Sequence, residues 1–150
     1  MKLSNQLGDV IVTHALGSCL GVSVHDPDAG VGGLLHVMMP VSSVNPDKAK
    51  LNPYMFVDTG LPAMFKNLYS MGAQKNRLVV KVAGGANVQN GHSDRFAIGK
   101  RNYISLKKIF WKNGILIHAE DVGGTKARTM YLHIDTGRVR LSTAGQEQDL

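Results

Sequence analysis

The chain has 150 residues, 43% hydrophobic and 19% charged, which suits a folded domain with a buried core and excludes a disordered protein. No apolar run approaches the roughly 18 residues of a membrane span, and residues 1–6 lack the apolar stretch of a signal peptide. The sequence therefore predicts no membrane insertion. Because its one cysteine, Cys19, cannot form an internal disulfide, we expect a reducing, cytoplasmic setting.

The net charge of +6 allows an acidic partner, but the basic residues are dispersed along the chain. The densest group, around Lys107 and Lys108, fits either a solvated helix face or a docking surface for an acidic protein. No zinc-finger spacing, arginine tract or aromatic-basic motif supports nucleic-acid binding, so none is predicted.

The first third of the chain predicts an antiparallel hairpin that follows a short strand. Residues 9–13 are rich in β-branched side chains, and residues 19–25 and 33–39 each alternate between two faces. Turn-forming residues at 26–30 join the two alternating runs. If Val22 pairs with Gly33, Cys19 lies directly opposite His36, and a register shifted by two residues leaves them diagonal neighbours.

The rest of the chain predicts two helices and four more strands. Residues 41–53 are expected to form a loop, and 61–71 a helix with Thr59 as N-cap and Gly72 after its end. A strand at 77–82, a mobile surface loop at 87–95 and a helix at 99–113 follow. Strands at 115–120, 128–134 and 138–141 precede a polar tail at 143–150. The pattern predicts a single α+β domain over residues 1–150, a layered sandwich of mostly antiparallel sheet with two main helices packed outside.

Cys19 and His36 are the residues best placed for chemistry. A thiol becomes a nucleophile at neutral pH when a base lies nearby, and His36 supplies one from the adjacent alternating run. Gly17 and Ser18, directly before the cysteine, allow backbone N–H groups to approach an oxyanion. Thr13 is expected to accept the other imidazole N–H and to fix the ring. Two alternatives stay open: the cysteine is a small buried hydrophobe, and the histidine a satisfied core residue.

The remaining candidate residues give weaker indications of function. The other five histidines are expected to be incidental, on the surface or half buried. The glycine pairs Gly32-Gly33 and Gly84-Gly85 match no phosphate-binding loop, so we interpret them as strand bends or as places where a substrate comes close. No spacing of histidine and cysteine indicates a metal site, and no cofactor is predicted.

In combination, these segments resemble the chemoreceptor glutamine deamidase family of bacterial and archaeal chemotaxis, CheD. The resemblance runs in order from about Asp9 to Leu141. Its matching segments are Thr13-His14-Ala15-Leu16-Gly17-Ser18-Cys19, Asp26-Pro27, Gly32-Gly33-Leu34-Leu35-His36 with Pro40, Lys81-Val82-Ala83-Gly84-Gly85-Ala86, Ile98-Gly99-Lys100-Arg101-Asn102, Asp121-Val122-Gly123-Gly124 with Arg128, and Thr136-Gly137-Arg138-Val139.

The resemblance implies a protein-glutamine glutaminase whose catalytic cysteine, histidine and threonine fall on Cys19, His36 and Thr13. It implies hydrolysis of selected glutamine side chains in the cytoplasmic helical region of chemoreceptors, extending to glutamate methyl esters, without a cofactor. It also implies a second partner, the chemotaxis phosphatase CheC.

A second hypothesis from another class is a binding module that docks the phosphatase or the receptor with little turnover. Its support in the sequence is Leu35, where members of the family often carry asparagine.

Overall fold

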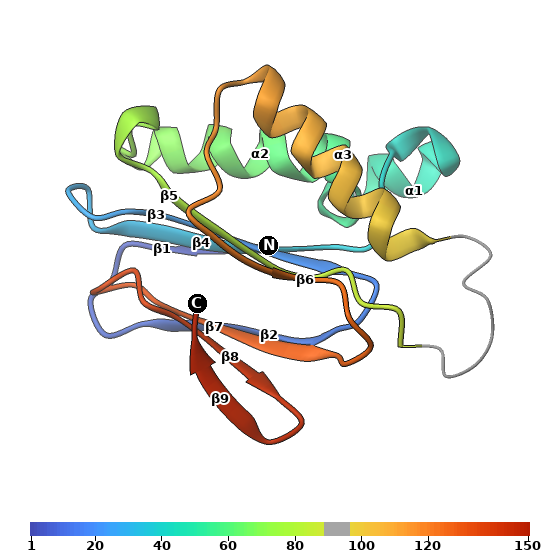
Figure 1. Ribbon diagram of the computed structural model, residues 1–150. Coiled ribbons are helices and arrows are strands. Elements are labelled where there is room, and N and C mark those ends of the chain that lie inside the picture. The colour runs from blue at the N-terminus through green and yellow to red at the C-terminus, as the bar shows by residue number, and fades with distance from the viewer. Residues whose placement is uncertain (89–96) are drawn as a thin grey trace.

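The computed structural model describes residues 1–88 and 97–150 and arranges them in three layers (Figure 1). Helices cover one face of a five-stranded sheet, and a four-stranded sheet packs against its other face. The predicted α+β sandwich, mostly antiparallel with helices outside, is therefore confirmed. Most of the predicted mobile loop, from residue 89 onward, lies outside the described residues.

The five-stranded sheet has the order β1-β4-β3-β5-β6. Its pairs are antiparallel except β5 with β6, which are parallel and joined through helix α3. Parallel neighbours need such a crossover, which a tight turn cannot supply. The strand bounds are β1 Lys2–Ser4, β3 Leu20–Asp26, β4 Val31–Val37, β5 Val79–Gly84 and β6 Ala119–Val122.

The four-stranded sheet has the order β2-β7-β8-β9 and is antiparallel throughout. Its strands are β2 Val10–Leu16, β7 Arg128–His133, β8 Val139–Thr143 and β9 Gln146–Asp149. The prediction of a polar tail at 143–150 is wrong, because these residues form the end of β8 and strand β9. All four residues of β9 are exposed, so no apolar alternation indicated the strand; backbone pairing and ion pairs hold it.

The two predicted helices are α2, Val57–Ser70, and α3, Ile98–Lys112. Thr59 is not the N-cap of α2: it lies inside the helix, and its hydroxyl donates to the carbonyl of Pro53. Gly72, at φ +99°, follows the helix end as predicted. The predicted loop at 41–53 contains a short helix, α1 Pro46–Leu51, capped by the side chain of Asn45. Among the helices that the structure describes, none is both long and apolar enough to cross a membrane.

Strand β3 separates two interior layers by its alternation. Leu20, Val22 and Val24 belong to the fully apolar core beneath the helices. Cys19, directly before the strand, packs against the second core, between the two sheets. Gly21 faces the same way, since a Cβ there would meet Leu16 and Met130 of that core. One face of β3 therefore contributes to the apolar core beneath the helices, and the other face lies toward the core between the two sheets.

The β3–β4 hairpin is antiparallel as predicted, but its register differs by two residues. Val22 pairs with Leu35, not with Gly33, and Gly21 pairs with His36. In the expected register Asp26 would lie opposite Ala29, whereas it pairs with Val31 and four residues, 27–30, form the turn. Asp26 stabilises this longer turn, because its carboxylate accepts the backbone N–H groups of two turn residues.

Candidate functional site

A hydrogen bond across the two sheets links Thr13 with His36. Thr13 lies in β2, and its hydroxyl is 2.8 Å from Nδ1 of His36 in β4. Both side chains are half buried. The other ring nitrogen of His36, Nε2, is buried and has no hydrogen-bond partner in the part of the chain that the structure describes. The imidazole is therefore held at one nitrogen and open to a proton at the other.

The turn that delivers Cys19 is clamped by the end of strand β5. The carbonyl of Cys19 accepts the N–H of Gly85 at 2.8 Å, and the carbonyl of Gly17 accepts the N–H of Ala86 at 2.8 Å. Gly84 has φ +111°, and a Cβ on it would lie 2.2 Å from the Cys19 oxygen. The two backbones approach so closely that only glycine fits at position 84. Gly84 and Gly85 both lie beside the backbone of the cysteine.

Cys19 and His36 both face the second sheet: Cys19 packs against the core between the sheets, and His36 bonds Thr13 of β2. His36 pairs with Gly21, and Cys19 lies two residues before Gly21, directly before the start of β3, in what corresponds to a diagonal position. Diagonal neighbours have Cα atoms roughly 7–8 Å apart, within reach of longer side chains. The residue directly opposite the imidazole is Gly21, and the side chains of Leu16 and Met130 lie against this glycine.

Burial keeps both groups near neutrality. It raises the pKa of the half-buried Cys19 thiol and lowers the pKa of His36, since each charged form loses hydration. At neutral pH the pair is therefore a thiol beside a neutral imidazole. Such a thiol needs a base to accept its proton before it can act as a nucleophile, and a neutral imidazole can accept one.

An irregularity in β2 shapes the approach to this turn. The pairing of β2 with β7 shifts between Thr13 and Leu16, and Ala15 has φ +56°, a left-handed conformation that is uncommon outside glycine. The shift carries the chain from Thr13, which contacts His36, into the turn of Gly17 and Ser18. Local backbone strain is common at functional sites.

Other predicted residues lie elsewhere. Gly32 and Gly33 pair with β3 near the hairpin turn, and Cβ atoms there would press into Ile134 and His25 or into Leu3. Their small size serves packing at the opposite end of the hairpin from the cysteine.

Leu35 faces the helices. It is fully buried in the apolar core and lies against Gly60 of α2, on the opposite side of the strand from His36. A leucine at this position therefore leaves the surroundings of the imidazole unchanged.

The remaining histidines include one correction. His25, predicted at the surface or half buried, is 4% exposed, and its Nε2 donates to the carbonyl of Ile134. His92 lies outside the described residues. Within residues 1–88 and 97–150, no group of three or more His, Cys, Asp or Glu side chains is placed to hold a metal ion.

Sequence reasoning missed Asn102 as a site residue. This asparagine of α3 is fully buried, and its amide donates to the carbonyls of Ser18 and Met38, both at 3.0 Å. The available signal was its spacing, since Asn102 precedes the buried Leu106 and Phe110 by one and two helical turns. A polar residue in a buried stripe needs a partner, which here is the backbone that carries Cys19.

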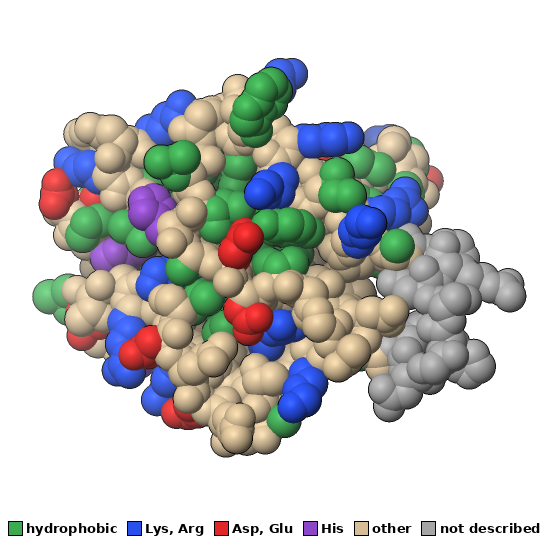
Figure 2. Space-filling view, in the orientation of Figure 1, with side chains coloured by type: hydrophobic (Ala, Val, Ile, Leu, Met, Phe, Trp, Pro, Cys, Tyr) green, Lys and Arg blue, Asp and Glu red, His purple; other side chains and the backbone are tan. Residues whose placement is uncertain are grey.

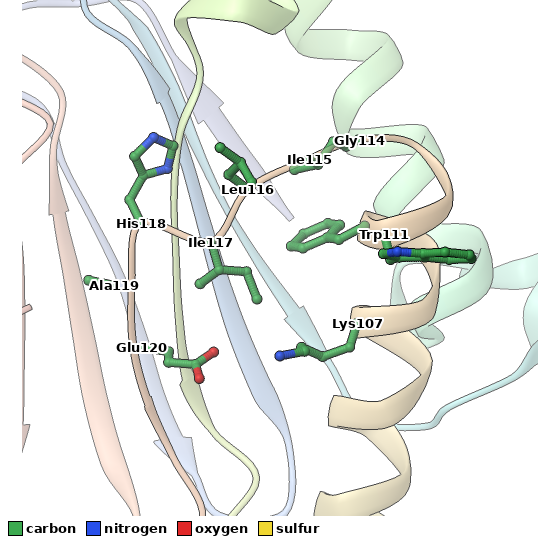
Figure 3. A pocket seen from close by; sticks show the side chains of 10 residues that line it. Lys107, Trp111, Gly114, Ile115, Leu116, Ile117, His118, Ala119 and Glu120 are labelled. Carbon is green, nitrogen blue, oxygen red and sulfur yellow. The ribbon is translucent and has the colours of Figure 1, made fainter.

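A groove of about 650 Å³ lies away from Cys19, between α3 and residues 114–120. In Figure 3, Lys107 and Glu120 point toward each other across it, and Trp111 extends outward. Trp111 is 87% exposed and Leu116 75%. Figure 2 shows hydrophobic side chains gathered across this face, with Lys and Arg around them. None of the residues lining the groove belongs to β2, β3 or β4, so it is separate from the cysteine and histidine.

Comparisons with known proteins give the family. The family model described as CheD chemotactic sensory transduction matches residues 38–143, beginning two residues after His36. Curated relatives extend the similarity to nearly the whole chain. A protein of Syntrophus aciditrophicus, named probable chemoreceptor glutamine deamidase CheD 1, is 50% identical over 144 residues, 96% of this chain and 89% of its own length.

Two further relatives carry the name probable chemoreceptor glutamine deamidase CheD. The protein of Solibacter usitatus is 47% identical over 94% of this chain and 83% of its own length. The archaeal protein of Pyrococcus abyssi is 43% identical over 88% of this chain and 80% of its own length. The resemblance seen in the sequence is thereby confirmed, and the chain belongs to the CheD family.

Proposed function

We propose that the chain is a protein-glutamine glutaminase that converts selected glutamine side chains of chemoreceptors to glutamate. The observation that carries the proposal is the Thr13–His36 hydrogen bond of 2.8 Å, which leaves the second imidazole nitrogen open on the face that Cys19 shares. The names of the curated relatives support the same substrate. The substrate region is the cytoplasmic helical part of the receptor, and the enzyme works in the cytoplasm.

The reaction begins with Cys19 and His36. With Nδ1–H donated to the Thr13 hydroxyl, Nε2 of His36 carries the lone pair that takes the thiol proton. The sulfur attacks the carboxamide carbon, and the C–O double bond opens to an oxyanion. We infer that the backbone N–H groups of Ser18 and Cys19 stabilise that oxyanion, since the N–H of Gly17 already donates to the carbonyl of Ala15 at 2.8 Å. Thr13 acts as the positioning residue of the set.

Collapse of this intermediate breaks the C–N bond. The imidazolium of His36 gives its proton to the departing nitrogen, so ammonia leaves and a thioester remains on Cys19. Water then attacks the thioester, His36 accepts the water proton and returns it to sulfur, and glutamate is released. The proposed hydrolysis consumes only water and needs no oxidant, metal or cofactor. A glutamate methyl ester presents the same acyl carbon, so we extend the proposal to methyl ester hydrolysis, with methanol as the leaving group.

The alternative of a binding module loses its support, because Leu35 lies in the helix-facing core and contributes nothing to the surface or to the imidazole. Docking of the chemotaxis phosphatase CheC remains part of the proposal as a second, regulatory interaction of the enzyme.

The test is incubation of the purified chain with a chemoreceptor cytoplasmic fragment, followed by an ammonia assay and site-resolved mass spectrometry. We expect ammonia release in step with conversion of particular glutamines, while glutamines of an unfolded peptide of the same sequence stay intact. A fragment left unmodified under all conditions, with or without added CheC, would contradict the proposal.

A further inference from the structure

Asn102 joins the two strands of the β3–β4 hairpin at the end opposite its turn. The regular pairing of this hairpin ends at Leu20 with Val37. Just beyond that pair, the two N–H groups of the Asn102 amide reach the carbonyls of Ser18 and Met38, each at 3.0 Å. One side chain thus continues the connection where the backbone ladder stops, although it comes from helix α3.

The two carbonyls belong to the backbone on either side of the site. Ser18 directly precedes Cys19, and Met38 lies two residues after His36. A displacement of either carbonyl would move the backbone that carries the thiol or the imidazole, because Ser18 is bonded to Cys19 and Met38 lies two residues from His36. The amide therefore acts on the relative placement of the two reacting groups.

The orientation of the amide is fixed by its surroundings. Rotating it by half a turn would bring Oδ1 against two carbonyl oxygens, which cannot donate. In the observed orientation, Oδ1 is buried without a hydrogen-bond partner in the described part of the chain, which is unfavourable for stability. Leu106 and Phe110, which follow at four-residue spacing on the same helix, are apolar and have no such unpaired group.

We propose that Asn102 is a positioning residue that fixes Cys19 relative to His36, so that the imidazole serves as the base for the thiol. The inference rests on the proposed function, since it needs the Cys19–His36 couple. It extends that function to a helix that contributes no reacting group.

The test is alkylation of Cys19 by iodoacetamide at pH 7 in a double-mutant cycle with His36→Ala and Asn102→Asp. Aspartate keeps the shape of asparagine but removes both N–H donors. In the otherwise native protein, we expect His36→Ala to slow alkylation roughly tenfold or more. In the Asn102→Asp background, His36→Ala should slow it by less than about twofold, because the thiol no longer reaches the imidazole.

Three further variants separate positioning from stability. Asn102→Leu removes the donors with an apolar side chain and serves if the aspartate variant fails to fold; it should also lose the His36 dependence. Leu106→Ala destabilises the same helix through a cavity and should retain the dependence. Asn113→Asp alters an exposed amide that bonds within α3 and should behave as the native protein.

On the receptor fragment, Asn102→Asp should lower kcat with little change in KM. Full His36 dependence of alkylation in a folded Asn102 variant would overturn the positioning role and leave the proposed function intact. Absence of His36 dependence in the native protein would overturn the Cys19–His36 couple itself, and with it the role of Asn102.

Discussion

The two ends of the β3–β4 hairpin differ in how completely their polar groups are satisfied. At the turn, the fully buried Asp26 carboxylate accepts two hydrogen bonds from turn backbone, a third from the N–H of Gln74 at 2.8 Å, and a two-pronged contact from Arg77. At the open end, His36 Nε2 and Asn102 Oδ1 are buried without partners in the described chain.

The difference indicates what each end does. A satisfied buried network contributes rigidity and stability, whereas an unpaired buried group costs stability and needs another explanation. At the open end the proposed function supplies that explanation, because Nε2 of His36 is the atom that we propose takes the thiol proton.

The largest effect is expected from Gly84→Ala, which disturbs the backbone at the open end of the hairpin. A Cβ at this position would lie 2.2 Å from the Cys19 carbonyl, and φ is +111°. We expect a loss of about 3 kcal/mol or more in the free energy of unfolding and of nearly all deamidase activity. Gly145→Ala is the matched control, with φ +81° and open space around it, and should cost about 1–2 kcal/mol with activity kept. Equal effects of the two substitutions, measured by urea unfolding and turnover, would contradict this explanation.

The next largest effect is expected from His36→Ala, which should lower the activity and leave the stability nearly unchanged. We expect kcat/KM to fall roughly 10²–10⁴-fold, as for loss of a general base, with an unfolding free energy within about 1 kcal/mol of the native value. In the native enzyme, the acid limb of the kcat/KM profile should lie below pH 6.5, because burial lowers the pKa of His36 and only the neutral ring accepts a proton. An acid limb above pH 6.5 would argue against His36 as the base.

Asp26→Asn should give the reverse result at the turn end. Removing one partner of a buried ion pair costs about 3–5 kcal/mol, while kcat of the folded enzyme should change less than about threefold. Burial alone would raise the pKa of Asp26, but Arg77 and the backbone N–H groups outweigh it and lower the pKa to about 2. The native network therefore stabilises fully above about pH 4, and this contribution is lost as the pH falls through about 2. The unfolding free energies of native and variant protein should therefore converge as the pH falls over that range. A difference that stays constant with pH would exclude Asp26 as the source of this pH dependence.

The smallest effect is expected from Thr13→Val, which keeps the shape but removes the hydrogen bond to His36. One hydrogen bond corresponds to about 1 kcal/mol, so we expect about a fivefold to tenfold fall in kcat, recovered in Thr13→Ser. Failure of serine to recover activity would show that the methyl group, and not the hydroxyl, sets the ring position.

The alternation of β3 could be predicted from the sequence, because period-two patterning fixes which side chains share a face. The register could not, since it depended on whether Asp26 lies opposite Ala29 or pairs with Val31 across a turn that its own carboxylate stabilises. The expected contact of Thr13 with the imidazole is present, although it crosses between two sheets whose packing could not be predicted from the sequence.

Two strands and one site residue could not be predicted from the composition of their segments. Strands β1 and β9 are short, and β9 is polar throughout, so pairing with their neighbours alone defines them. Asn102 required knowledge of which backbone lies beneath α3. A polar residue on a buried stripe can be noticed in the sequence, but its partners, Ser18 and Met38, are 84 and 64 residues away along the chain.

The central claim is tested most directly by acid quenching of the enzyme during turnover of a receptor fragment, followed by mass spectrometry of its peptides. We expect a glutamyl thioester on Cys19 and no turnover in a folded Cys19→Ala variant. An acyl group on another residue, or ammonia release by Cys19→Ala at the native rate, would contradict the claim.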